Sequence, residues 1–282
     1  MNFFRMESPD GTWCAEVSAR LGANVTRLQH AGQDVLIPLR SEQQLQENPY
    51  LIGSPLLFPA NRTHKGQFTF QGKTHQLPVN EPFTESHLHG LLHQQAFCMQ
   101  EITDSRVVLM YENHGEIYPF PFRMTVEYRL QNEGFTQHYR VDNIGTTDMP
   151  FTFALHTTFA EPTTFSVPIC ACQEKNERHI PTGRYVALNA QESEYPLGSP
   201  SKGLVISGYY KACGQTANVG DYTYTMSDNF DHWILFNGRG ESGLLCVEPQ
   251  CGAVNGLNNG DCKVLKPDES ETFYTCIAKK NT

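Results

Sequence analysis

The sequence predicts an all-β protein whose strands form a large antiparallel β-sandwich. Apolar and polar residues alternate along many short segments, which is the period-two pattern of half-buried strands. Two pairs of these segments are joined by short turns that predict β-hairpins, and Gly, Pro, Asn or Asp bounds most of the others. Since the strand segments do not alternate with long helical ones, the pattern does not support a parallel α/β sheet.

The first predicted hairpin joins residues 67–70 to residues 73–77 through a turn at Gln71-Gly72. Alternation places Phe68 and Phe70 on one face of this hairpin.

The second predicted hairpin begins with a strand in which every other residue is apolar: Met124, Val126, Tyr128 and Leu130. Asn132-Glu133-Gly134 forms its turn, and residues 135–141 form the returning strand.

Further strands are expected at residues 107–111, 149–156, 204–210, 221–226, 232–237, 243–248 and 272–278. Only residues 40–46 suggest a helix. All-β sandwiches can reach ~200–250 residues as one domain. Because the 282 residues contain no internal repeat and no long Gly/Ser/Pro-rich linker, we expect one domain over residues 1–282.

The net charge of −9 argues against nucleic acid as a partner, because phosphate binding requires a basic patch. No apolar stretch approaches the ~20 residues that span a bilayer, so we expect no membrane partner. The N-terminus lacks the pattern of a secretory signal, and nine cysteines without zinc-site spacing indicate reduced thiols. We therefore expect a cytoplasmic protein.

An apolar run from Pro55 to Pro59 ends in an amide and a guanidinium, Asn61 and Arg62. The five donors of an arginine lie in one plane and suit the oxygens of a polar substrate. The alternative is a surface arginine that follows a buried strand.

The segment His87-Leu88-His89-Gly90-Leu91-Leu92-His93 would place His87 and His89 on one face of an extended chain. Such a pair, with His93 nearby, can ligate zinc or iron, as in cupin-like sandwiches. The glutamate expected a few residues later is absent, because Gln94 and Gln95 stand there. Catalysis, sugar binding, metal binding and a structural role all remain open for these histidines.

Two further candidates stand at the ends of apolar strands. Glu248 follows Leu244-Leu245-Cys246-Val247, where a carboxylate is seldom found unless it is paired or functional. His156 ends a similar segment, where a lone histidine is more often a hydrogen-bonded structural group.

Taken in order, these segments resemble the signature set of the aldose 1-epimerase (mutarotase) family, whose fold is a galactose mutarotase-like supersandwich. The resemblance is carried best by residues 53–90, from the Pro-Leu-Leu-Phe-Pro run with Asn-Arg to the His-Leu-His-Gly segment. Two later segments resemble those that carry the family's other histidine and its closing glutamate: His-Thr-Thr-Phe at 156–159 and Glu-Pro-Gln-Cys-Gly-Ala-Val-Asn-Gly at 248–256.

The resemblance implies that Glu248 is the general base for the anomeric hydroxyl of a free hexose and that His156 is the general acid for the ring oxygen. His89 and Arg62 would hold and polarise the ring oxygen and the neighbouring hydroxyls, with Asn61 and His87 beside them. Positioned proton transfer suffices for a hemiacetal, so we expect neither metal nor cofactor. A small-molecule sugar would be the substrate, and the protein would be a monomer or a loose homodimer.

Two departures from galactose mutarotases leave the sugar open. This chain has Thr157 and Thr158 where those enzymes place an aromatic residue after the second histidine. For the aspartate that binds sugar hydroxyls, Asp221, Asp228 and Asp231 are candidates, and Asp228 is favoured. Trp233 could stack on the sugar or belong to the core.

Alternative functions also follow from the residues. A phosphorylated or sulfonated sugar would need additional cations in the cleft, and their possible sources are Lys175, Arg178 and Arg184. A non-catalytic carbohydrate-binding or sensing protein would keep Arg62 and the histidines without needing Glu248 as a base. A metal-dependent sandwich enzyme would bind its ion at His87, His89 and His93.

Overall fold

Two eight-stranded antiparallel sheets make up most of the structure, a computed structural model that describes residues 3–238, 240 and 243–280. In the first sheet the order is β10 (Cys98–Ile102), β11 (Arg106–Asn113), β12 (Phe122–Gln131), β13 (Gly134–Asn143), β26 (Ser270–Lys279), β22 (Tyr222–Met226), β21 (Thr216–Val219) and β17 (Phe165–Ser166).

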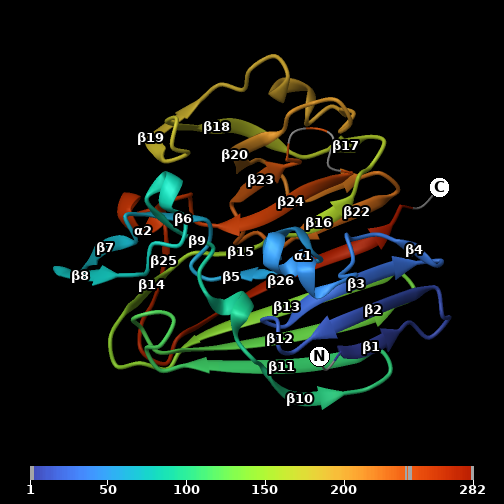
Figure 1. The fold of residues 1–282 in the computed structure, drawn as a ribbon, viewed down its shortest axis with the longest axis horizontal. Coiled ribbons are helices and arrows are strands. Elements are labelled where there is room, and N and C mark those ends of the chain that lie inside the picture. The colour runs from blue at the N-terminus through green and yellow to red at the C-terminus, as the bar shows by residue number, and fades with distance from the viewer. Residues whose placement is uncertain (1–2, 239, 241–242, 281–282) are drawn as a thin grey trace.

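The second large sheet carries most of the residues that matter below. Its order is β19 (Pro181–Val186), β18 (Ile169–Lys175), β20 (Ser207–Ala212), β23 (His232–Phe236), β24 (Leu244–Cys251), β15 (Phe153–Leu155) and β5 (Leu56–Leu57), and β16 (Thr158–Ala160) also pairs with β24. In Figure 1, β18 and β20 lie at the top, β10 and β11 at the bottom, and β24 and β26 between them.

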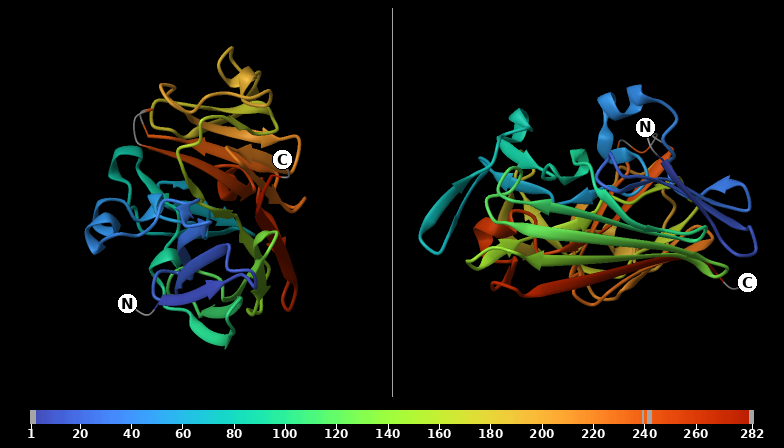
Figure 2. Two further views of the ribbon diagram at one scale, coloured as in Figure 1. Left: turned by 90° about the vertical axis from the view of Figure 1, so that its right-hand side faces the viewer. Right: turned by 90° about the horizontal axis from the view of Figure 1, so that it is seen from below.

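Smaller sheets complete the molecule. One has the order β1 (Phe3–Glu7), β2 (Trp13–Ser18), β3 (Asn24–His30) and β4 (Gln33–Asp34). The two-stranded pairs are β6 (Arg62–His64) with β9 (Ser86–Leu88), β7 (Gln67–Phe70) with β8 (Lys73–Gln76), and β14 (Met149–Phe151) with β25 (Lys263–Leu265). In the right-hand view of Figure 2, the blue strands β1 to β4 and the teal β7–β8 hairpin project from the two large sheets.

Aromatic side chains hold the two large sheets together. Tyr224 of β22 packs against Trp233 of β23, with ring centroids 6.0 Å apart, and Tyr139 of β13 packs against Phe153 of β15 at 5.4 Å. Burial of such rings is the main favourable contribution to folding. The Tyr224 hydroxyl also bonds Thr157 at 2.7 Å, which ties the segment after β15 to the opposite sheet.

The all-β antiparallel fold is confirmed, and so are both hairpins: β7 pairs with β8, and β12 pairs with β13 along its whole length. The predicted helix is α1 (Glu42–Glu47), and a second short helix, α2 (Gly256–Asn259), was not expected.

Several strands were not predicted, among them β1 to β4 of the four-stranded sheet and β18 and β19 of the second large sheet. In β2, Trp13, Ala15 and Val17 are buried on one face. The apolar Cys14 stands where the alternation would place a polar residue, so the period-two pattern is interrupted. In β19 every residue after Pro181 is exposed, so no alternation exists to be detected.

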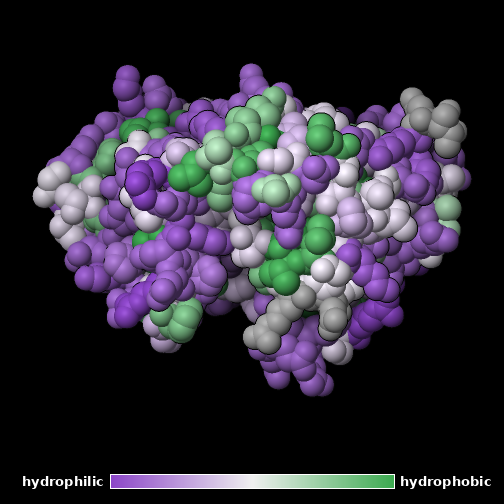
Figure 3. Space-filling view, turned by 90° about the horizontal axis from the view of Figure 1, so that it is seen from above, coloured by the Kyte–Doolittle hydropathy of each residue, from purple (hydrophilic) through white to green (hydrophobic). Residues whose placement is uncertain are grey.

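The surface is largely polar. On the face shown in Figure 3, hydrophilic residues predominate and the apolar ones form separate patches. All nine cysteines are free thiols. Within the described part of the chain, no helix combines the length and apolar character that a membrane crossing requires.

Candidate active site

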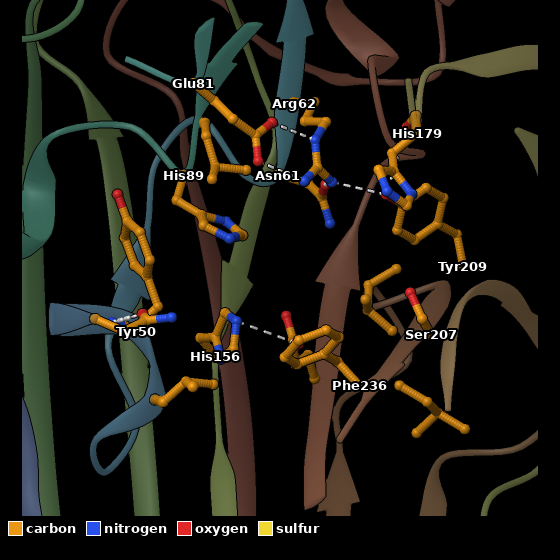
Figure 4. A pocket seen from close by; sticks show the side chains of 16 residues that line it. Tyr50, Asn61, Arg62, Glu81, His89, His156, His179, Ser207, Tyr209 and Phe236 are labelled. Atoms are coloured by element: carbon orange, nitrogen blue, oxygen red, sulfur yellow. Dashed lines mark hydrogen bonds and ion pairs between the residues drawn. The ribbon is translucent and has the colours of Figure 1, made fainter. Parts of the chain in front are cut away.

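A pocket of about 220 Å³, lined by both polar and apolar side chains, opens where β6 and β9 approach the second large sheet. Its lining residues are Asn48, Tyr50, Leu51, Asn61, Arg62, Glu81, Leu88, His89, His156, His179, Ser207, Tyr209, Ile234, Leu235, Phe236 and Glu248. Figure 4 shows the labelled side chains pointing toward a common space, with Tyr50 and His89 on one side and Ser207 and Tyr209 on the other.

His156 occupies a break between two strands. β15 pairs with residues 250 and 251 of β24, β16 pairs with residues 244–246, and His156 lies between β15 and β16 beside the part of β24 that neither covers. The His156 amide donates to the carbonyl of Pro55 at 2.9 Å, and the Val247 amide donates to the carbonyl of Thr157 at 3.0 Å. The backbone therefore holds the imidazole beside Glu248.

Glu248 and His156 form a buried acid/base pair. The Nε2 atom of His156 lies 3.5 Å from Oε1 of Glu248, and their side chains are only 8% and 2% exposed respectively. Burial raises the pKa of Glu248 well above its usual value, although the charge of Arg62 opposes this. Burial lowers the pKa of His156 to about 4. Because burial disfavours both charged forms, it favours a neutral pair with one titratable proton.

Arg62 is fixed in the pocket by a bidentate ion pair. Its Nε and Nη2 atoms donate to the two carboxylate oxygens of Glu81 at 2.6 and 2.7 Å, and its Nη1 donates to the hydroxyl of Tyr209 at 2.7 Å (Figure 4). Burial works to raise the pKa of Glu81, but hydrogen bonds from Arg62 and Thr84 and the charge of Arg62 lower it overall. The pair thus stays ionised and holds the guanidinium plane in place.

Asn61 and His89 both adopt left-handed backbone conformations, with φ of +54° and +62°. The His89 amide donates to the Asn61 carbonyl at 2.8 Å, so each of these strained residues holds the other. Residues other than glycine seldom adopt this conformation, and such strain is concentrated at functional sites. Burial and the nearby charges of His156 and Arg62 lower the pKa of His89, which keeps its ring neutral.

Five of the residues selected from the sequence line the pocket together: Asn61, Arg62, His89, His156 and Glu248. They come from β6 and the residue before it, from β24, and from the segments that follow β9 and β15, regions far apart in the sequence.

Three selected residues, His87, Trp233 and Asp228, are not among those that line this pocket. His87 is fully buried and its Nδ1 bonds the carbonyl of Pro78 at 2.7 Å. Trp233 belongs to the core, where its indole N–H donates to the carbonyl of Gly214 at 3.1 Å. Asp228 is exposed in the turn between β22 and β23.

The other lining residues were not selected from the sequence, and those among them with polar or aromatic side chains are Asn48, Tyr50, Glu81, His179, Ser207, Tyr209 and Phe236. Glu81 could have been found as the acidic partner that a buried arginine requires. The rest carry no sequence signal, because single tyrosines, histidines, serines, asparagines and phenylalanines are common in strands and loops.

A metal-binding arrangement of three groups also exists here. The ligand atoms of His156, Cys246 and Glu248 lie within 4.8 Å of one another, and all three residues are buried. Such a nitrogen, sulfur and oxygen set suits Zn²⁺. Among the described residues, His87, His89 and His93 do not form a comparable group, so the structure does not bring together the metal site considered for them.

Fold and pocket together define a class of protein: a large antiparallel β-sandwich with a buried pair of carboxyl and imidazole groups at the wall of a pocket. The chain belongs to the aldose 1-epimerase family, because the model of that family matches residues 14–277.

Similar proteins and structures were found in several bacteria. The uncharacterized protein YihR of Escherichia coli is 29% identical over 140 residues, which are 48% of this chain and 44% of that protein. The chain thus matches less than half the length of this curated relative.

The structure of a galactose mutarotase-like protein from Clostridium acetobutylicum has a TM-score of 0.89 at 21% identity, covering 96% of this chain and 94% of that one. A galactose 1-epimerase from Lactobacillus acidophilus has a TM-score of 0.78 at 17% identity, covering 99% and 98%. At these identities the two structures establish a shared fold.

Proposed function

We propose that the protein is a single-domain aldose 1-epimerase that interconverts the α and β anomers of a free hexose. The observation that carries this proposal is the buried pair of Glu248 and His156, whose reactive atoms lie 3.5 Å apart at the wall of the pocket. Membership of the aldose 1-epimerase family supports the same chemistry.

The number of protons on the pair fits the reaction. Ring opening needs one group that accepts the proton of the anomeric hydroxyl and one that donates a proton to the ring oxygen. One proton shared by Glu248 and His156 provides both functions, since the group without it is the base and the group with it is the acid. The number of protons on the pair is the same before and after each ring opening or closure.

In the proposed cycle, the shared proton first passes from the carboxyl group of Glu248 to His156. Glu248 then accepts the proton of the anomeric hydroxyl while His156 protonates the ring oxygen. The bond between the anomeric carbon and the ring oxygen breaks, and the open-chain aldehyde forms. Rotation about the adjoining carbon–carbon bond and reversal of both proton transfers closes the ring on the opposite face. Arg62 favours this charge distribution, because its charge lowers the pKa of Glu248.

The remaining lining residues would position the sugar. Arg62, held by Glu81, keeps its plane directed at the pocket, and the neutral His89 can hydrogen-bond a hydroxyl or the ring oxygen. Asn61 adds an amide beside them. Tyr50, Tyr209 and Phe236 provide the aromatic surface in the place expected for Trp233.

Polarimetry tests the proposal. Freshly dissolved α-glucose and α-galactose are followed at neutral pH, with a chelator present, for the wild-type protein, E248Q and a charge-matched control, D228N. We expect the wild type and D228N to speed the approach to equilibrium. E248Q should be slower by roughly 10²–10⁴-fold, the usual contribution of an acid/base group.

Sugar binding, measured by calorimetry, separates the alternatives. E248Q should retain affinity, because the amide keeps the shape of the carboxyl group. Binding without any acceleration by the wild-type protein would overturn the enzymatic proposal and identify a carbohydrate-binding protein.

A further inference from the structure

Cys246 lies beside the acid/base pair, although it is not among the residues that line the pocket. β16 and β24 pair antiparallel with Thr158 opposite Cys246. Continuing this register by two residues places His156 opposite Glu248. Residues two apart on a strand share a face, and so do residues opposite one another on paired strands. The side chains of Cys246, His156 and Glu248 therefore point to the same side.

The ligand atoms of these three residues are close enough to share one ion. They lie within 4.8 Å of one another, and Nε2 of His156 is 3.5 Å from Oε1 of Glu248. Two ligands of a tetrahedral Zn²⁺ ion, each bonded at about 2.1 Å, stand about 3.4 Å apart, so the histidine and the glutamate already have this spacing. A movement of about 1 Å by the thiol would complete the set, since Zn–S bonds are about 2.3 Å long.

The chemistry of the three groups favours zinc over harder ions. Thiolate and imidazole ligands suit Zn²⁺, whereas Mg²⁺ and Ca²⁺ prefer oxygen. All three residues are buried. A thiolate and a carboxylate together carry two negative charges, which balance the charge of Zn²⁺, so the buried complex would be neutral overall. The protons that these groups hold without the metal would leave to solvent.

Thr158 holds the thiol in this position, and the pocket gives an ion access to it. The Oγ1 atom of Thr158 lies within hydrogen-bond distance of Sγ of Cys246, at 3.5 Å, and Cys246 is a free thiol. Such neighbouring groups orient metal ligands. His156 and Glu248 line the pocket of about 220 Å³, so an ion would enter by the route of the sugar. Its fourth coordination position would face the pocket, where water would fill it.

We propose that Cys246, His156 and Glu248 form an inhibitory Zn²⁺ site. The bound ion would occupy Nε2 of His156 and the carboxylate of Glu248, so neither group could exchange a proton with a sugar. The inference rests on the proposed function and adds regulation of the same pocket: inhibition by Zn²⁺ that a chelator reverses. Cys246 is the residue that turns the acid/base pair into a three-ligand metal site.

Polarimetry in the presence of Zn²⁺ tests the inhibition, with Mg²⁺ as the control ion. Each rate is expressed relative to the rate of the same variant with a chelator. Zn²⁺ should slow anomerisation by the wild-type protein, an excess of chelator should restore the rate, and the same concentration of Mg²⁺ should have no effect. Anomerisation that Zn²⁺ leaves unchanged or accelerates would overturn the inhibitory site.

Variants assign the effect to the thiol. In C246S and C246A the Zn²⁺ concentration that halves the rate should rise by at least about tenfold, because the ion loses one of its three protein ligands. The matched control is C251S, which changes another buried cysteine of β24 and should keep the sensitivity of the wild type. Sensitivity of both Cys246 variants equal to that of the wild type would contradict the assignment.

A spectroscopic measurement keeps this inference separable from the proposed function. Co²⁺ can replace Zn²⁺ in such a site, and a thiolate bound to Co²⁺ gives a charge-transfer absorption band in the near ultraviolet. The wild-type protein and C251S should show this band, and C246S should lack it. A band that depends on Cys246 in a protein that anomerises no sugar would support the site and refute the epimerase. Anomerisation that Zn²⁺ does not inhibit, without such a band, would do the reverse.

Discussion

At the scale of single residues, the pocket depends on how each charge is balanced. Arg62 is 15% exposed and remains ionised because Glu81 takes two of its hydrogen bonds. Glu248 has no comparable partner, so burial sets its pKa and prepares it to exchange a proton with His156. Two glutamates in one pocket thus have opposite roles, one structural and one chemical, because their neighbours differ.

The first prediction concerns Glu81 as a positioning residue. In E81Q, the Arg62 guanidinium loses its compensating charge and part of its orientation, so we expect kcat/KM to fall by about 10- to 100-fold, mostly through KM. Chemical unfolding should show a loss of about 1–3 kcal/mol, because a partly buried charge is left unpaired. E85Q, which removes the exposed ion pair with Arg178, should change kcat/KM and the free energy of unfolding by little. A kcat-only effect would show that Glu81 does not act through substrate positioning.

At the scale of elements, the conformation of the loop after β9 depends on a close contact between its backbone and that of another segment. Gly90 has φ of +65°, and a Cβ atom there would lie 1.9 Å from the carbonyl oxygen of Phe58. This close approach holds His89 against the segment that leads to Asn61 and Arg62. Only glycine fits, because any side chain would push the two segments apart.

Gly90→Ala should therefore damage stability and activity together. We expect the free energy of unfolding to fall by several kcal/mol and anomerisation to drop at least tenfold as His89 moves. The matched control is Gly72→Ala, in the β7–β8 turn, which has φ of +77° but no atom within 4 Å of the added Cβ. It should cost only about 1 kcal/mol of backbone strain. Similar losses of unfolding free energy in the two variants would refute the role of the close approach.

At the scale of the whole molecule, buried histidines couple stability to pH. Burial lowers the pKa of His93 and of His156 to about 4, and it also lowers the pKa of His89. In the unfolded chain these rings titrate near ~6.5, so the unfolded state binds more protons as the pH falls below that value. Their contribution to stability is lost as the pH falls. Glu248 acts in the opposite direction, because its raised pKa makes the folded state the one that binds the proton.

On unfolding in this pH range, the three histidines take up more protons than Glu248 releases. The free energy of unfolding should therefore decrease between pH 6.5 and pH 5. We expect a loss of roughly 1–3 kcal/mol per pH unit, since each group contributes about 1.4 kcal/mol per unit. Urea unfolding at pH 7, 6 and 5 measures this change in the free energy of unfolding. In H93Q the free energy of unfolding should change less per pH unit, by the contribution of about one proton. A stability that rises on acidification would contradict the assignment.

The alternation of apolar residues along each strand is a local property, and for that reason the hairpins at β7–β8 and β12–β13 could be predicted. The same reasoning missed β19, whose side chains are exposed on both faces. It also missed β2, in which Cys14 interrupts the alternation.

By itself the sequence determined the fold class, the two hairpins and the motifs that contain Asn61, Arg62, His89, His156 and Glu248. Only the tertiary structure decided which candidates meet. It places His87 and Trp233 in buried positions, leaves Asp228 exposed, and brings Glu81 and Tyr209 to Arg62. The physical reason is that strand periodicity depends on neighbouring residues, whereas the pocket and the pKa of each group in it depend on sheet order and burial, which join residues far apart in the chain.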